Sequence, residues 1–110
     1  MLTKVQVPGC RGTLVQRLLS GDGLQVLSVD VEPGGEIPLH SHDCAATMVI
    51  TKGRARALGN SPRLVAAGDV VVKAPKDPHG FAEISEPFSF ISISDRDGIL
   101  HNDGWDVVYE

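Results

Sequence analysis

The chain has 110 residues, of which 42% are apolar and 22% charged, a balance that is typical of a folded globular protein and excludes a disordered one. This length is enough for one domain with a hydrophobic core, and we expect a single domain over residues 1–110. The formal net charge of −4 disfavours binding to nucleic acid and to anionic membrane surfaces, because it does not attract them.

Nothing in the sequence indicates export or a membrane span. No apolar stretch approaches the length that crosses a bilayer, and residues 1–9 lack the apolar core of a signal peptide. We therefore expect a cytoplasmic protein. Cys10 and Cys44 are predicted to be free thiols, because two cysteines in different elements match neither a disulfide framework nor a paired zinc motif.

Short β-rich runs recur along the whole chain. They cover, in order, residues 4–7, 14–19, 24–32, 37–42, 47–52, 70–73, 81–85 and 88–94. Clusters of turn-forming residues separate them, among them 20–23, 33–35 and 95–98. Apolar positions at helical spacing are repeatedly interrupted by Gly or Pro, which disfavours a helix-rich fold. This rhythm predicts an all-β sandwich or barrel.

The last segment, residues 95–110, is more polar than the rest. Its sizeable apolar residues are Trp105, Val107, Val108 and Tyr109. The segment can dock over the barrel or pair with a partner chain, and the pattern does not choose between these alternatives. Trp105 and Tyr109 fit closure of the barrel mouth and packing in an interface equally well.

Three of the four histidines are placed to share a metal ion. His40 and His42 lie two residues apart on a predicted strand, so both point to one face with Cα atoms about 6.6 Å apart. A third ligand must come from another strand. His79 is the candidate, because it opens a strand after a turn with two prolines that restrict the backbone. His101 stands alone in the tail, and we expect ordinary packing or hydrogen bonding for it.

The residues around the first two histidines resemble the first sequence motif of the cupin superfamily. That motif runs glycine, five residues, HxH, three or four residues, Glu, six residues, glycine. Gly34, His40, His42 and Gly53 fall in register with it. The glutamate position falls on Ala46, so the carboxylate ligand of the motif is missing.

The second cupin motif is matched in part. Gly68 and His79 stand at its glycine and histidine positions. Ala74, Lys76 and Glu83 replace its proline, second glycine and asparagine.

The resemblance covers residues 34–83, including a strand pair expected over 54–66. It implies the cupin fold, a jelly-roll barrel or double-stranded β-helix with the metal near one open end. It also implies a homodimer as the common assembly. The strand rhythm independently agrees with such a barrel.

The expected metal centre therefore consists of His40, His42 and His79 alone. Three neutral imidazoles leave the full charge of a divalent ion in place and leave coordination positions open, which favours anionic, chelating ligands. Iron, manganese, nickel, copper and zinc all suit such a site, and ligand type does not choose among them. Two further ligands are possible alternatives. One is Cys44, in the turn directly after the HxH pair. The other is Thr47, which would take the glutamate position if four residues instead of three separated it from the HxH pair.

Five residues are candidates for the wall of the pocket: Ala46, Met48, Ile50, Phe81 and Glu83. The first three are expected to share one inward face, and Phe81 to share the face of His79. Glu83 would share that face too, but about 13 Å from His79 and thus too far to coordinate the same ion. The apolar members fit a plain hydrophobic core equally well.

The leading hypothesis is a metal-dependent enzyme of dioxygenase type that acts on a small anionic or chelating organic molecule. Glu83, His101 and Tyr109 are its candidate general bases. The alternatives are a non-catalytic protein that binds or senses a small ligand or metal, and a zinc-type isomerase, lyase or cyclase. A barrel of this kind hosts many chemistries, so the fold alone does not decide.

Overall fold

The structure is a computed structural model that describes residues 4–97, 99–101 and 104–110. The other positions of the expected domain, 1–3, 98 and 102–103, lie outside the described residues. All regular secondary structure in the described part is β. The strands are β1 (Lys4–Gln6), β2 (Arg11–Gly21), β3 (Leu24–Ser41), β4 (Ala46–Lys52), β5 (Arg54–Gly59), β6 (Arg63–Ala66), β7 (Val70–Lys73), β8 (His79–Ala82), β9 (Phe88–Ser94), β10 (Leu100–His101), β11 (Gly104–Trp105) and β12 (Val108–Tyr109). A helix able to cross a membrane is accordingly not found among these residues.

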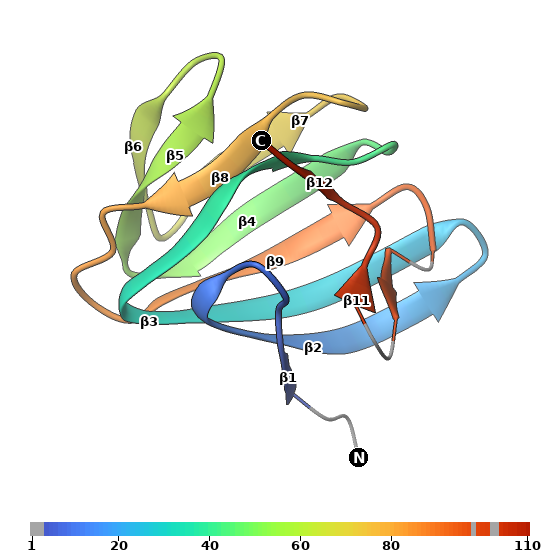
Figure 1. The fold of residues 1–110 in the computed structure, drawn as a ribbon, viewed down its shortest axis with the longest axis horizontal. Helices are drawn as coiled ribbons and strands as arrows, with labels where there is room; N and C mark the ends of the chain where they lie inside the picture. The colour runs from blue at the N-terminus through green and yellow to red at the C-terminus, as the bar shows by residue number, and fades with distance from the viewer. Residues whose placement is uncertain (1–3, 98, 102–103) are drawn as a thin grey trace.

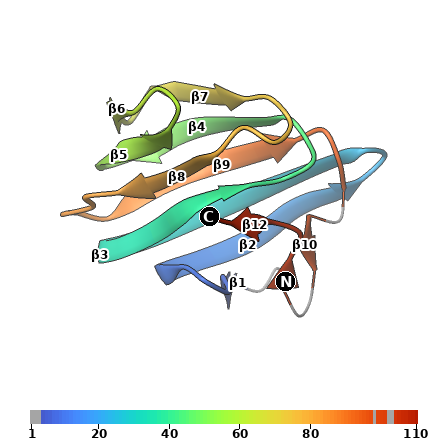
Figure 2. The same cartoon turned by 45° about the horizontal axis from the view of Figure 1, so that its top comes forward.

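Ten of the strands form one strongly curled antiparallel sheet, as Figures 1 and 2 show, and β10 and β11 pair as a separate two-stranded sheet. The order of the larger sheet is β6-β5-β8-β3-β9-β4-β7, and outside this path β2 and β12 also pair with β3, while β1 pairs with β2. The long strand β3 belongs to both halves of the curl. Its first part pairs with β2 and β9, and its last part pairs with β8 and β12. The all-β jelly-roll prediction is thereby confirmed.

Strand β3 corrects one sequence-based expectation. Residues 24–32 and 37–42 were expected to be two strands separated by a turn at 33–35, but the strand is continuous from Leu24 to Ser41. Gly34 adopts a φ of 81°, and β2 shifts register opposite this segment. The glycine pair therefore bends the strand without ending it.

The core lies inside the curl and follows the alternation of the strands. On β3, Leu27, Val29 and Val31 are buried, while the residues between them are partly exposed. Phe81, Phe88 and Phe90 form its aromatic centre, with ring centroids 4.9 to 5.8 Å apart. Such tilted ring pairs add to the stability that burial of the rings provides.

The tail docks on the barrel of its own chain. Strand β12 pairs with the end of β3, where Tyr109 lies opposite His40. Further back, the buried Gln25 side chain accepts a hydrogen bond from the Leu100 backbone N–H at 2.9 Å and donates one to the Leu100 carbonyl at 3.3 Å. The tail is thus fixed at two places, and one of them is next to a predicted metal ligand.

Candidate metal centre

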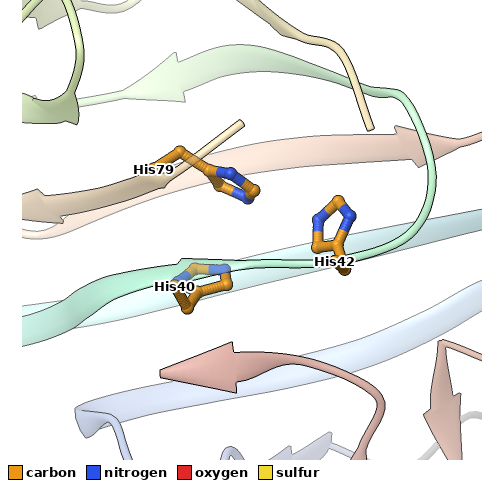
Figure 3. A group of neighbouring side chains, drawn as sticks. All are labelled: His40, His42 and His79. Atoms are coloured by element: carbon orange, nitrogen blue, oxygen red, sulfur yellow. The ribbon is translucent and has the colours of Figure 1, made fainter. Parts of the chain in front are cut away.

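The end of β3 and the start of β8 bring the three histidines together (Figure 3). His40 and His79 are direct cross-strand partners, and their ring centroids lie 4.4 Å apart. His42 follows just after the end of β3, with its ring 4.8 Å from that of His79 and 6.1 Å from that of His40. One candidate ligand atom from each residue lies within 4.8 Å of the others.

Local backbone features hold this arrangement. A Cβ atom at Gly80 would lie 2.5 Å from the Ile37 carbonyl oxygen, so only glycine lets β8 approach β3 this closely beside His79. The loop before β8 is tied to the other strand, because the Lys76 backbone N–H donates to the His42 carbonyl at 2.8 Å. The positions of the histidines therefore depend on backbone contacts between the two segments.

Each imidazole is also oriented through its Nδ1 atom. Nδ1 of His40 lies 2.8 Å from the Pro38 carbonyl oxygen, and Nδ1 of His79 lies 2.9 Å from that of Asp77. Nδ1 of His42 lies 3.2 Å from the Cys44 carbonyl oxygen. Because a carbonyl only accepts hydrogen bonds, these contacts favour a proton on Nδ1 and leave Nε2 with a free lone pair. This is the arrangement that metal-binding histidines commonly have.

The spacing fits a first-row transition metal. Ligand nitrogens at about 2.1 Å from one ion are at most about 4.2 Å apart. The candidate ligand atoms lie within 4.8 Å of one another, so only a small rotation of the rings is needed for all three to reach one ion. The set contains nitrogen alone, which suits zinc, copper, iron or nickel better than magnesium or calcium. The three histidines can therefore hold such an ion.

Burial keeps these imidazoles neutral. It lowers the pKa of His40 from 6.5 to about 4, with a smaller contribution from His42. It lowers the pKa of His79 to about 3, helped by the neighbouring His40, and it also lowers the pKa of His42. A neutral imidazole is the form that coordinates a metal, so the site needs no deprotonation near pH 7.

We expect the metal-free protein to lose about 2–4 kcal/mol of unfolding free energy between pH 7 and pH 5. His40 and His79 have lowered pKa values, so the unfolded chain binds more protons than the folded chain in this interval. The stability they provide is complete above the unfolded pKa of 6.5 and is lost as the pH falls. Urea unfolding of the metal-free protein at both pH values measures this, and equal stability would contradict it.

The histidines open onto a small apolar cavity inside the barrel, with a volume of about 40 Å³. Apart from the histidines, none of the described lining residues is ionisable. The lining consists of Leu27, Val29, Ile37, Met48, Phe81, Phe90, Ser92, Ser94, Ile99 and Trp105 together with the three histidines. A cavity of this volume is small beside an organic ligand, so such a ligand has to extend beyond it.

Two of the five candidates for the pocket wall, Met48 and Phe81, line this cavity. Ala46 and Ile50 are buried in the barrel but are not among its lining residues. Thr47 lies between the inward-facing residues of β4 and is partly exposed on the other face, where it cannot reach the histidines. The alternative that Thr47 serves as a ligand is therefore wrong.

Glu83 does not line the cavity. Strand β8 ends at Ala82, and Glu83 adopts a φ of 57°, so the alternation that was expected to turn its side chain inward stops before it. Its exposed carboxylate instead accepts a hydrogen bond from Arg56. This placement also removes it as a candidate general base, because it is out of hydrogen-bond reach of the cavity.

The other two candidate bases have partners outside the cavity. His101 is exposed, with its Nε2 atom 3.2 Å from a carboxylate oxygen of Asp106. The Tyr109 hydroxyl donates to the Pro8 carbonyl, and burial raises its pKa. The ring of Tyr109 nevertheless lies 5.8 Å from that of His40, so Tyr109 packs beside the centre as a neutral phenol.

Cys44 lies behind His42, away from the centre. Its Sγ atom is 3.1 Å from Nδ1 of His42, the nitrogen that does not face the proposed ion. Burial raises the pKa of this thiol, which keeps it protonated. Cys44 is therefore placed to support His42, and the sequence-based alternative of a fourth ligand is not favoured. Both cysteines are free thiols, as expected.

Trp105 is a site residue that the histidine pattern did not indicate. Its ring stacks on that of His40 at a centroid distance of 5.4 Å and an angle of 29°. Its indole N–H donates to the Tyr109 hydroxyl at 2.9 Å. The tail brings Trp105 to this place, and the only sequence signal was the cluster of apolar residues in an otherwise polar segment.

An open groove outside the barrel shares two residues, His42 and Trp105, with the inner cavity. These two side chains therefore stand between the metal centre and the groove. Ion pairs line the groove: Arg96 lies 2.7 Å from Asp106, and Lys76 lies 3.9 Å from Asp43. The groove thus reaches His42, one of the three candidate ligands.

Comparison with known proteins agrees with this architecture. The Cupin domain family, Cupin_2, matches residues 27–94. No match was found among curated proteins. A cupin-2 domain protein of Rhodospirillum rubrum is 28% identical, with a TM-score of 0.75 over 88% of this chain and 71% of that one. A cupin-like protein of Thermotoga maritima is 25% identical, with a TM-score of 0.73 over 84% and 75% of the two chains.

A third similar structure is a polyketide cyclase from Streptomyces resistomycificus. It is 19% identical, with a TM-score of 0.74 over 93% of this chain and 83% of that one. At this level of identity the likeness concerns the fold alone, and a shared fold does not transfer an activity.

Proposed function

The chain belongs to the cupin domain family, and we propose that it is a metal-dependent enzyme of dioxygenase type acting on a small anionic or chelating organic molecule. One observation carries this proposal. Three neutral imidazoles, each oriented through Nδ1, converge at one end of an apolar cavity that contains no carboxylate ligand. A divalent ion held there keeps its full charge and has positions left for substrate.

His40, His42 and His79 would hold the ion, and an iron ion would supply the chemistry needed to use dioxygen. The protein's own contribution is orientation and exclusion of water. Pro38, Asp77 and Cys44 fix the rings through their carbonyl oxygens. The apolar lining keeps bulk water from the site, which strengthens electrostatic attraction between the ion and an anionic ligand.

An experiment with dioxygen tests the proposed reaction class. Protein reconstituted anaerobically with Fe(II) is mixed with a panel of small chelating acids, thiols and enols, and dioxygen consumption is recorded. We expect turnover with one ligand class, no turnover with Zn(II), and loss of turnover in His42→Ala but not in His101→Ala. Turnover with Zn(II) in the absence of dioxygen would instead establish the lyase, isomerase or cyclase alternative. A metal-loaded protein that binds ligands without turnover with either metal would be a binding or sensing cupin.

The groove gives a separate prediction about ligand charge. Arg96 is partly exposed and pairs with Asp106, and its charge is near enough to lower the pKa of His42. We expect Arg96→Gln to weaken oxalate binding to the metal-loaded protein about tenfold, as expected for loss of one charged hydrogen bond. Arg54→Gln is the matched control, because Arg54 is also an exposed partner of one carboxylate, Glu86.

Isothermal titration calorimetry measures the affinity of the metal-loaded Arg96→Gln and Arg54→Gln variants for oxalate. Equal weakening in the two variants would mean that only net charge matters. Unchanged affinity in Arg96→Gln would remove the groove from the ligand-binding site.

A further inference from the structure

Trp105 lies at the boundary between two spaces, the apolar cavity inside the barrel and the open groove outside it. Of the described residues, only Trp105 and His42 line both. The indole of Trp105 is half-buried and stacks on the ring of His40 at a centroid distance of 5.4 Å. Trp105 therefore forms part of the wall that separates the groove from the metal centre.

Trp105 is held in place by the tail and by the turn at residues 8–9. Its indole N–H donates a hydrogen bond to the Tyr109 hydroxyl at 2.9 Å, and that hydroxyl donates in turn to the Pro8 carbonyl. A Cβ atom at Gly9, whose φ is 81°, would lie 2.6 Å from the Tyr109 ring, so glycine allows the turn to pack against this ring. The indole is thus part of a fixed wall, and a ligand meets it without first having to order it.

The space on the two sides of this wall is very unequal. The inner cavity has a volume of about 40 Å³, whereas the groove has about 690 Å³. Sites that take up an organic molecule usually have about 300–1,000 Å³, so the cavity admits little beyond the coordinating atoms of a ligand. The groove has room for the rest of such a ligand, which then leaves the metal centre beside Trp105.

We propose that Trp105 sets the size of the ligand that can bind at the metal centre. This inference rests on the proposed function, because it concerns the substrate of the same site. Slender chelating anions, such as dicarboxylates without a side group, fit beside the indole. Dicarboxylates that carry an aromatic ring next to the chelating group are rejected, because that ring overlaps the fixed indole, and such a clash is a common source of specificity.

Trp105 can select ligands without taking part in metal binding. His42 lies at the same boundary, but it is a candidate ligand, so its replacement would also remove the ion. Trp105 provides no ligand atom and stacks on the ring of His40. The Tyr109 hydroxyl acts through Trp105 and is a positioning group for it. A change of Trp105 should therefore alter selectivity while the ion stays bound.

Isothermal titration calorimetry of the Zn(II)-loaded full chain with malonate and phenylmalonate tests the proposal. The two ligands carry the same chelating group and differ by a phenyl ring, so the ratio of their dissociation constants reports the effect of that ring. We expect the wild type to bind phenylmalonate at least about tenfold more weakly than malonate, and Trp105→Ala to lower this ratio at least about tenfold, which pocket shape can provide. Val108→Ala is the matched control and should keep the wild-type ratio, because Val108 lies on the same tail and lines the groove but not the cavity.

Circular dichroism and zinc analysis confirm that each variant is folded and loaded before it is compared. If Trp105→Ala does not fold, Trp105→Leu carries the test, because it keeps an apolar side chain but removes the indole. An unchanged ratio in the folded, zinc-loaded Trp105 variant would overturn the inference and leave the proposed function standing, and so would equal affinity of the wild type for both ligands. A wild type that holds no zinc, or that holds zinc and binds neither ligand, would instead contradict the proposed function and this inference with it.

Discussion

Replacing Phe81 with alanine is expected to lower the free energy of unfolding by about 3–5 kcal/mol. Phe81 is 1% exposed, and its ring packs against Phe88 and Phe90 at centroid distances of 5.1 and 4.9 Å. Truncation removes the apolar surface that the ring buries and leaves a void next to the metal cavity. Both losses act in the same direction, because the three rings form the centre of the core.

Urea unfolding of metal-free protein measures this loss without a contribution from metal binding. Leu64→Ala is the matched control, since Leu64 is 70% exposed and its truncation should cost less than about 0.5 kcal/mol. A loss below about 1 kcal/mol for Phe81→Ala would mean that the core is not organised around this ring.

The largest effect on the site is expected from His79→Ala, which should weaken Zn(II) and Co(II) binding at least about a hundredfold. Loss of a residue that only hydrogen-bonds to a metal ligand usually weakens metal binding by about 10- to 100-fold, and loss of a ligand should cost more. His79 lies opposite His40 on the neighbouring strand and is the one candidate ligand that β3 does not provide. Without it, the two remaining imidazoles come from positions two residues apart in one segment, so the ion loses its ligand from the opposite strand. The expected loss is therefore one of affinity and not of fold.

Competition with a chromophoric chelator measures this affinity for both metals. His101→Ala is the control, because His101 lies exposed beside Asp106 and outside the cluster. If His79→Ala changed the metal affinity less than about threefold, which is under about 1 kcal/mol of binding free energy, His79 would be excluded as a ligand.

Much of the barrel could be predicted from the sequence because its strands alternate clearly. Strands β7 and β9 have the bounds that the β-rich runs indicated. His79 opens β8 as expected, but β8 covers His79–Ala82 and not the predicted run 81–85. The HxH spacing also indicated correctly that His40 and His42 lie close together. These features depend on local periodicity and on strong turn signals, which are present in the sequence itself.

The departures from the second cupin motif illustrate what local sequence does not reveal. Lys76 stands where the motif has glycine, and it adopts a φ of 68°; Glu83 stands at the asparagine position with a φ of 57°. Both residues adopt the left-handed conformation, which glycine and asparagine adopt at lower cost. The inward alternation expected for Glu83 fails because its backbone leaves the extended conformation.

The contacts of the tail could not be predicted, because they join residues far apart in sequence. Trp105 reaches His40 only because β12 pairs with β3 and because Gln25 holds Leu100. The buried Gln25 looks like an ordinary polar residue of a strand in the sequence. Its role appears only in the structure, where the oxygen and the nitrogen of its side-chain amide both bind the Leu100 backbone.

Elemental analysis of tag-free protein purified without chelators tests most directly whether the three histidines hold a transition metal. We predict close to one equivalent of iron, manganese, nickel, copper or zinc per chain, either as purified or after anaerobic reconstitution, and loss of this metal in His42→Ala. Protein that retains no metal above background after reconstitution with each of the five ions would contradict the account.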